Sequence, residues 1–425
     1  MGNVSPEEEY PISIAKGVKL ILGSVCVPGV AGKVVFLAGT DKIPATLSYG
    51  IVGMNCQGVG SGASVGLHLK AAPNKDVPPV NALLTSMRKL NIGYLVQAGT
   101  FSATQPKFID CGTAYRIDGG SVTDDSNTST GSLDYGVDCR STTDPSAQSI
   151  ANLYGGTYGM PKVRGLWAGH NCAMTATYVV VGVGQFVPCE SLAPGVGVYV
   201  EGNAKVTMTS GHIKCMAQGG VRVHADPTNK PGVPDVVLAN NKIRNNGCAG
   251  LLADHGKVTA FGNAIVKNHW GVIQRGEAVL AEGPIRLVGQ DKSGTTARNT
   301  LACNGKAAGG ACCTEAACPV GYDVWNHSAS PLDASFNFWQ ESPVTQYNCN
   351  KDLGGCQCVF TAQCMTSPPD GTPVVNSPMA NGTAGKTTTK NNALGRASSL
   401  FAGPPSSGQG PLAGDVAKVV RRISR

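Results

Sequence analysis

The chain has 425 residues, of which only 14% are charged, 6% are aromatic and 56 are glycine. This composition disfavours a helical protein, which depends on Glu, Lys, Leu and Ala, and indicates many short strands separated by turns. The formal net charge of +7 is concentrated after residue 365, where the sequence contains seven basic residues and two acidic ones. The preceding part carries the remaining +2, so we expect no nucleic-acid partner.

The N-terminal segment lacks a secretory signal, because Met1 is followed by Gly2, Asn3 and the acidic run Glu7–Glu9. Sixteen cysteines nevertheless indicate an oxidising compartment rather than a reduced metal protein. We therefore expect the mature or trimmed form of an extracellular or cell-surface protein. No segment is long and apolar enough for a membrane span.

Residues 1–300 contain a repeated segment that begins with Gly, an apolar residue and a variable residue. Its copies start at Gly66, Gly136, Gly165, Gly197, Gly220, Gly250 and Gly271, of which the last four are the clearest. Two further columns keep the same register, namely Val206, Val236, Val258, Val279 and Ile213, Ile243, Ile265, Ile285. The last intervals are about 20 to 22 residues long, and an insertion at 226–231 stretches the first. A period of this size predicts a repeat fold.

Asparagines recur where the predicted strands must bend. The pairs Asn240-Asn241 and Asn245-Asn246 are followed one coil later by Asn263 and Asn268. Asn tolerates left-handed backbone and can stack in ladders between coils. Three short strand runs per coil without helical periodicity predict an all-β protein, a parallel β-helix. A leucine-rich repeat lacks its Leu spacing here, and a propeller needs a longer repeat.

The C-terminal part changes in composition twice. Residues 301–364 contain eight of the cysteines, in spacings that suit zinc poorly, and they predict a disulfide-tied cap on the open end of the solenoid. The pairing of these cysteines stays open. Residues 365–425 are rich in Pro, Gly, Ser, Thr and Asn, which predicts a disordered, low-complexity tail.

Three segments carry a resemblance to a known group: Tyr10–Ile14, Val237–Gly247 and Asp333–Trp339. They resemble an uncharacterised family of secreted bacterial proteins within the pectate-lyase-like superfamily of right-handed parallel β-helices. The resemblance covers roughly residues 10–345; it implies the fold and is nearly silent on activity. The strand and Ala-rich helix that cap the first coil in that family are missing from this sequence.

Equivalent residues of successive coils stack about 4.8 Å apart. The third residue of each repeat is predicted to point outward, which gives the column Asp138, Trp167, Tyr199, Arg222, Leu252, Ile273. Aromatic rings can stack on sugar C–H faces, and Asp and Arg can hold hydroxyls or uronate carboxylates. We therefore predict a polysaccharide or cell-surface glycan partner, bound by Asp138, Trp167, Tyr199 and Arg222. The alternative is that loops cover these side chains as a small secondary core.

Two residues further along each strand, a second column reads Arg140, Gly169, Glu201, His224, Asp254, Arg275. Stacked carboxylates, a histidine and an arginine suit acid–base chemistry. An alternative function is therefore a polysaccharide lyase or glycoside hydrolase with the catalytic residues Glu201, His224, Asp254 and Arg275. The same acids and histidine could bind a divalent cation, and otherwise no cofactor is expected. The third alternative is a structural or adhesive surface rod.

One further motif has a weaker signal. Asp124-Asp125 and His170 occur in the order seen in polygalacturonase-like hydrolases, but the Gly after His170 and a later Arg-x-Lys are missing. Asp124 and Asp125 are flanked by Ser and Thr, so we expect them in a loop where they cap turns. The sequence does not indicate a substrate or an oligomeric state.

Overall fold

The structure is a computed structural model. It describes the residues 9–11, 21–22, 33–38, 49–53, 55–57, 65–71, 77, 79–131, 133–183, 188–224, 232–254, 256–275, 285–288, 298–302, 304, 324–327 and 337–339. All of them belong to one compact unit, Met1–Gly382. The predicted tail and most of the predicted cap lie outside the described residues.

The described elements are all β-strands, and they form three sheets, A, B and C, with parallel pairing. Sheet A consists of β1 (Glu9–Pro11), β3 (Lys33–Ala38), β6 (Val65–Ala71), β9 (Ile92–Val96), β12 (Thr113–Ile117), β15 (Leu133–Cys139), β18 (Pro161–Ala168), β21 (Val196–Glu201), β24 (Val221–His224), β27 (Ala249–Asp254), β30 (Trp270–Arg275) and β33 (Val324–His327). Sheet B consists of β2 (Ile21–Leu22), β4 (Tyr49–Val52), β7 (Val80–Leu83), β10 (Thr100–Thr104), β13 (Ser121–Asp125), β16 (Ser149–Tyr154), β19 (Cys172–Thr177), β22 (Lys205–Thr209), β25 (Asp235–Ala239), β28 (Lys257–Phe261) and β31 (Ile285–Val288). Sheet C consists of β5 (Asn55–Gln57), β8 (Ser86–Arg88), β11 (Lys107–Ile109), β14 (Thr128–Thr130), β17 (Thr157–Tyr158), β20 (Val180–Gly182), β23 (His212–Lys214), β26 (Lys242–Arg244), β29 (Ala264–Val266), β32 (Thr300–Ala302) and β34 (Phe338–Trp339).

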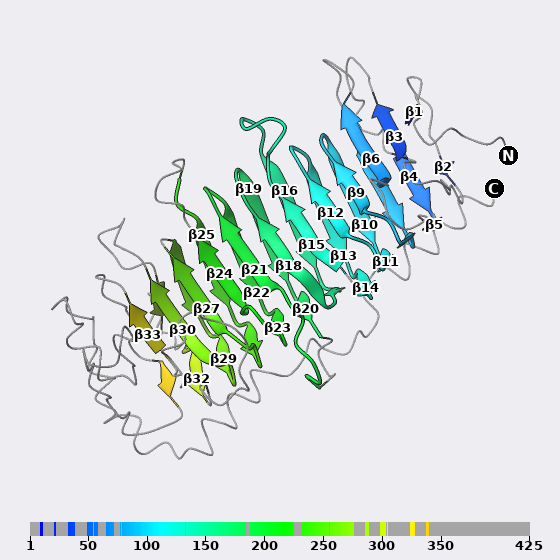
Figure 1. Cartoon of the computed structure of the whole chain (residues 1–425). Helices are drawn as coiled ribbons and strands as arrows, with labels where there is room; N and C mark the ends of the chain where they lie inside the picture. The colour runs from blue at the N-terminus through cyan, green and yellow to red at the C-terminus, as the bar shows by residue number, and fades with distance from the viewer. Residues whose placement is uncertain are drawn as a thin grey trace. The chain divides into compact units, whose positions relative to one another are not determined.

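From β6 onward each complete coil contributes one strand to sheet A, then one to sheet B and one to sheet C, before the chain returns to sheet A. In Figure 1 the strands of sheet A follow one another from β3 in blue to β33 in gold. This arrangement confirms the predicted all-β parallel solenoid. The strands β33 and β34 extend sheets A and C into the segment that was predicted to be a cap.

The glycine of the repeat lies where successive coils approach too closely for a side chain. A Cβ on Gly165 would lie 2.5 Å from the carbonyl oxygen of Gly197, and one on Gly197 would lie 2.5 Å from that of Gly220. The sequence pattern did not identify the coils of β9 and β12. Tyr94 in β9 and Tyr115 in β12 occupy the position where the repeat has Val or Leu. Aromatic side chains fill the same interior position there.

The two apolar columns are confirmed except at their ends. Val258 pairs with Ile285 in sheet B, and Ile265 pairs with Leu301 in sheet C. The predictions that Val279 and Ile285 end these two columns were therefore wrong. Residues 276–284 separate β30 from β31, whereas only 255–256 separate β27 from β28, so the fixed offset fails in this coil.

The interior of the solenoid is a packed core that runs along the described coils. Its largest side chains include Tyr94, Phe101, Phe108 and Tyr115, all fully buried. The rings of Phe101, Phe108 and Tyr115 have centroids 4.7, 5.6 and 5.3 Å from that of Tyr94, in tilted, edge-to-face and stacked arrangements. Such ring pairs add to the stabilisation from burial itself.

Two asparagine ladders run through the turns, as the sequence predicted. The ladder between sheets B and C is Asn241, Asn263, Asn299 and Asn337, and the ladder between sheets C and A is Asn246, Asn268 and Asn304. From the second member of each ladder on, the Oδ1 accepts from the backbone N–H and the side-chain amide of the preceding member. Asn240 and Asn245, just before the ladders, have left-handed φ angles of 55°. The asparagines therefore satisfy buried backbone groups at both corners.

We expect Asn263→Ala to lower the free energy of unfolding by about 2–5 kcal/mol. The change leaves the buried Leu238 carbonyl and the Asn241 backbone N–H without their partner on this side chain, and each such loss costs about 1–3 kcal/mol. Urea denaturation followed by circular dichroism measures the effect. The control is Asn240→Gly, which should be within about 1 kcal/mol of wild type because Gly adopts left-handed backbone freely. Equal stability of both variants would contradict the role of the ladder.

A buried carboxyl group joins the three sheets inside the solenoid. The expectation that Asp124 caps a loop was wrong, because it lies on β13 with its side chain fully buried. Asp124 Oδ1 accepts from the Tyr115 hydroxyl at 2.8 Å, and Oδ2 accepts from the Tyr158 hydroxyl at 2.7 Å and from the Asn127 amide. Burial raises the pKa of Asp124 to about 6, although the three hydrogen bonds oppose the shift.

This raised pKa predicts a specific pH dependence. An ordinary Asp has a pKa of about 3.9, so the folded state binds the extra proton between about pH 4 and 6. The stabilisation from protonated Asp124 is complete below this window and is lost as the pH rises through it, by about 3 kcal/mol. We expect Asp124→Asn to remove this part of the slope when unfolding free energies of both proteins are compared from pH 4 to 7. Parallel curves would contradict the prediction.

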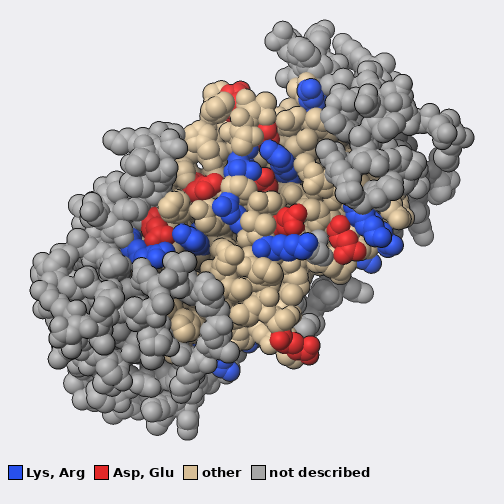
Figure 2. Space-filling model, viewed as in Figure 1, with Lys and Arg blue, Asp and Glu red and all other residues tan. Residues whose placement is uncertain are grey.

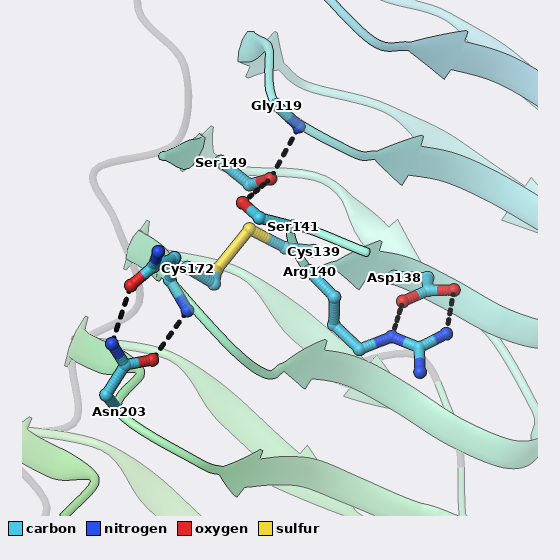
Figure 3. The surroundings of a disulfide bond; sticks show 9 residues. Gly119, Asp138, Cys139, Arg140, Ser141, Ser149, Cys172 and Asn203 are labelled. Atoms are coloured by element: carbon cyan, nitrogen blue, oxygen red, sulfur yellow. Dashed lines mark hydrogen bonds and ion pairs between the residues drawn. A yellow bond between two sulfur atoms is a disulfide. The ribbon is translucent and has the colours of Figure 1, made fainter. Parts of the chain in front are cut away.

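Two disulfides lie within the described residues, Cys139–Cys172 and Cys189–Cys215. The first connects sheet A to sheet B of the next coil, beside a corner where Ser149 accepts from the Gly119 backbone N–H and bonds the Ser141 hydroxyl (Figure 3). Disulfides indicate an oxidising, non-cytosolic environment. None of the described residues forms a helix that could cross a membrane.

Candidate functional site

The register of sheet A confirms that the predicted outward residues stack on successive coils. Asp138 pairs with Trp167, Trp167 with Tyr199, and Tyr199 with Arg222. The second column is also in register, since Glu201 pairs with His224, His224 with Asp254, and Asp254 with Arg275. The insertion at 226–231, which lies outside the described residues, does not shift this register.

One end of the site is a bidentate ion pair. Asp138 is only 5% exposed, and its two carboxylate oxygens accept from Arg140 Nε at 2.6 Å and Nη2 at 2.8 Å. Arg116, one coil earlier, lies 4.0 Å from the same carboxylate. Figure 3 shows the Arg140 side chain turned toward Asp138 and away from the disulfide of its neighbour Cys139. Asp138 therefore serves to hold arginines rather than to face solvent.

The Trp167 ring is covered by cations. The Arg140 guanidinium carbon lies 3.3 Å from the ring centroid, and that of Arg164 lies 3.8 Å from it. Tyr135 also stacks on Trp167, with centroids 5.4 Å apart. The indole Nε1–H donates to Glu201 Oε1 at 2.8 Å. These contacts occupy the surfaces that a sugar ring would need for stacking.

Arg164 joins the two predicted aromatic residues. Its guanidinium carbon lies 3.7 Å from the centroid of Tyr199 and 3.8 Å from that of Trp167, so the cation contacts both rings. Burial lowers the pKa of Arg164 from its ordinary value, but a guanidinium still stays charged in a protein. Burial likewise raises the pKa of Tyr199. Arg222 contacts the Tyr199 ring more loosely, at 6.0 Å.

The other end of the site is centred on Asp254. Its carboxylate lies 2.8 Å from Arg275 Nε, 3.4 Å from Arg222 Nη2 and 3.9 Å from His224 Nδ1. Burial would raise the pKa of Asp254, but His224, Arg275 and Arg222 outweigh it and hold the pKa below its usual value. Asp254 therefore stays ionised at neutral pH and is unsuited to act as a general acid.

These contacts form one continuous series along the solenoid axis, which we call the arginine ladder. It consists of Arg116, Asp138, Arg140, Trp167, Arg164, Tyr199, Arg222, Asp254 and Arg275. With Glu201 bound to Trp167, five guanidinium groups face three carboxylates, an excess of two positive charges. Figure 2 shows basic and acidic side chains interspersed over sheet A rather than a field of one sign.

Sequence reasoning missed Arg116, Arg164 and Tyr135. Arg116 was missed because its coil was not recognised as a repeat, although it pairs directly with Asp138. Tyr135 and Arg164 pair with each other three residues before Asp138 and Trp167. Aligning the residues three positions before Asp138 and Trp167 as a third column would have identified both Tyr135 and Arg164 from the sequence.

The outward column that begins with Asp138 and Trp167 ends in a small hydrophobic cluster. Leu252 and Ile273, its last two predicted members, are buried together with Cys248, Ala249 and Trp270. Within the described residues, the covered secondary core that we considered for the whole column is therefore present at this end. Among the described residues, no group of three or more His, Cys, Asp or Glu side chains could hold a metal ion.

Comparisons with protein-family models, with curated proteins and with solved structures give no match. The parallel β-solenoid is therefore established by its sheets and registers rather than by relatives.

We expect Asp254→Asn to lower the free energy of unfolding at pH 7 by about 1–3 kcal/mol, because Arg222 and Arg275 lose their anionic partner. Since the pKa of Asp254 is lowered, this difference should be complete above the ordinary value of about 3.9 and shrink as the pH falls below it. Thermal or urea unfolding at pH 7 and pH 3 measures it.

The matched control is Asp235→Asn on the neighbouring sheet B. Within the described part of the chain, Asp235 has one ion-pair partner, Lys257, at 3.9 Å, and its side chain is more exposed than that of Asp254, so its loss should cost at most about 0.5 kcal/mol. An Asp254→Asn variant as stable as this control would show that the carboxylate does not hold the arginines.

Proposed function

We propose that this is a secreted or cell-surface β-helix protein whose arginine ladder binds an acidic polysaccharide. The observation that carries the proposal is the row of guanidinium groups on one face, held by rings and carboxylates and still partly exposed. The exposed fractions of the Arg116, Arg140, Arg222 and Arg275 side chains are 40%, 24%, 37% and 27%. Guanidinium groups bind carboxylate and sulfate oxygens through paired N–H donors.

The geometry favours an acidic ligand over a neutral one. The faces of Trp167 are in contact with Arg140 and Arg164, so a sugar would have to displace a cation before it could stack. An acidic polymer instead meets arginines whose positions are already set. Pre-positioned side chains lose less conformational freedom on binding. In this proposal Asp138, Trp167 and Tyr199 position the arginines, and Arg222 contacts the ligand.

Three further observations support an extracellular glycan partner. The disulfides indicate an oxidising environment. The sequence resemblance to secreted bacterial β-helix proteins of the pectate-lyase-like superfamily agrees with such a location and with a polysaccharide as ligand. Equivalent groups that recur on successive coils also suit a polymer with a repeated unit.

The test is binding to a glycan array, followed by titration with polygalacturonate. We expect Arg222→Gln to weaken binding about tenfold, since one charge-assisted contact is worth roughly 1.5 kcal/mol. Trp167→Ala/Tyr199→Ala should weaken it further, because Arg140 and Arg164 lose their supports. Binding should also fall as salt rises.

Arg88→Gln removes the same charge from an exposed position on sheet C and is the control; it should leave binding unchanged. If wild type binds no glycan, the proposal fails, and the ladder serves only to join coils of a structural rod. If Arg88→Gln and Arg222→Gln weaken binding equally, the effect depends on the net charge of the protein and not on the arginine ladder.

A lyase or hydrolase is the second candidate, because the register stacks Glu201, His224, Asp254 and Arg275 on consecutive coils. The lowered pKa of Asp254 keeps it ionised, as a nucleophile must be. Turnover of uronate polymers that is lost in Asp254→Asn while binding is kept would favour this candidate over binding alone.

A further inference from the structure

The outer face of sheet B differs chemically from the outer face of sheet A. In six consecutive coils the outward position in the middle of the strand is neutral and polar, and we call these residues the hydroxyl–amide column: Asn81, Ser102, Thr123, Asn152, Thr175 and Thr207. All are exposed except Ser102, which is half-buried. Within the described residues no side-chain hydrogen bond or ion pair joins any of the six. Their donors and acceptors therefore face outward about 4.8 Å apart.

Two exposed tyrosines stand at the edge of this column, at the corner between sheets B and C. Tyr154 ends β16 and is 54% exposed, whereas Tyr178 follows β19 and is 37% exposed. Their ring centroids lie 5.6 Å apart and the rings are perpendicular. Tyr154 is two residues from Asn152, so the rings and the column border one continuous surface.

Tyr178 also occupies a backbone position that does not suit a large side chain. Its φ is 58°, in the left-handed region, where bulky residues are disfavoured. The equivalent corners of other coils share this left-handed conformation and carry Leu84, Gln105, Ser126, Gly155, Ser210, Asn240 and Gly262, so the fold imposes it whatever the side chain.

We propose that Tyr154, Tyr178 and the hydroxyl–amide column form a second binding surface, which takes a neutral polysaccharide chain. The outward positions of β16 and β19 carry no charged residue. The charged group beside the tyrosines is Asp125, which pairs with Tyr154 and would repel an acidic polymer, whereas Lys205 pairs with Ala173 at the opposite end of the strands. A tyrosine ring offers an apolar face to sugar C–H groups and a hydroxyl at its tip. The hydroxyls and amides of the column replace water around the sugar hydroxyls, and their regular spacing suits a repeated ligand.

The experiment uses the full chain and a panel of soluble neutral polymers, namely mixed-linkage β-glucan, galactomannan and arabinoxylan, with polygalacturonate as the acidic comparison. We expect Tyr154→Ala/Tyr178→Ala to weaken binding to the neutral polymer at least tenfold and to leave polygalacturonate binding unchanged. Leu84→Ala is the matched control, because Leu84 lies at the same corner, is also 54% exposed and also has a left-handed φ of 53°. It should change neither affinity.

Tyr178→Gly separates a ligand role from a structural one. Gly adopts this backbone freely, so the variant should keep or raise the melting temperature while it loses the neutral polymer. A lower melting temperature with unchanged binding would show that the tyrosine pair is structural and would overturn the proposal. Absence of wild-type binding to all three neutral polymers would also overturn it, whatever the result with polygalacturonate.

Discussion

The axial stacking of parallel strands is the constraint on which the rest of this structure depends. Each coil repeats its neighbour at a rise of about 4.8 Å, so equivalent side chains meet their counterparts along the whole solenoid. A position in such a column therefore suits a residue that can pack against an identical residue on the next coil. Glycine satisfies the constraint where carbonyl oxygens approach, and asparagine satisfies it at the corners, because its amide both donates and accepts.

Charged residues meet the same constraint on the outer face of sheet A, where like charges on adjacent coils would repel. The arginine ladder avoids this by alternation, since rings or carboxylates separate its guanidinium groups. Arg164 shows the principle most clearly, because it lies between Trp167 and Tyr199 rather than beside another cation. The alternation converts an aromatic strip into a support for cations, and it shifts the proposed ligand from neutral sugars toward acidic ones.

The interior and the outer face of sheet B complete this picture. Asp124 is tolerated in the core because hydroxyls from two other sheets and one amide surround it, at the cost of a raised pKa. In the six coils from β7 to β22, the middle of sheet B instead presents neutral hydroxyls and amides, with Tyr154 and Tyr178 at its edge. One solenoid thus carries two outer faces with different chemistry, because alternation along each strand leaves the outward residues free to differ.

The sequence alone determined the parallel solenoid, the stacked order of Asp138, Trp167, Tyr199 and Arg222, and the asparagine ladders. The rise between coils is fixed and side chains alternate strictly along each strand, so residues at a fixed sequence offset become spatial neighbours. This is why these predictions were confirmed. Only the tertiary structure decided which guanidinium covers which ring, that Leu252 and Ile273 are buried, and which cysteines pair. Those features depend on side-chain direction and on the length of each coil, as the misplaced Val279 shows, and a repeat pattern contains neither quantity.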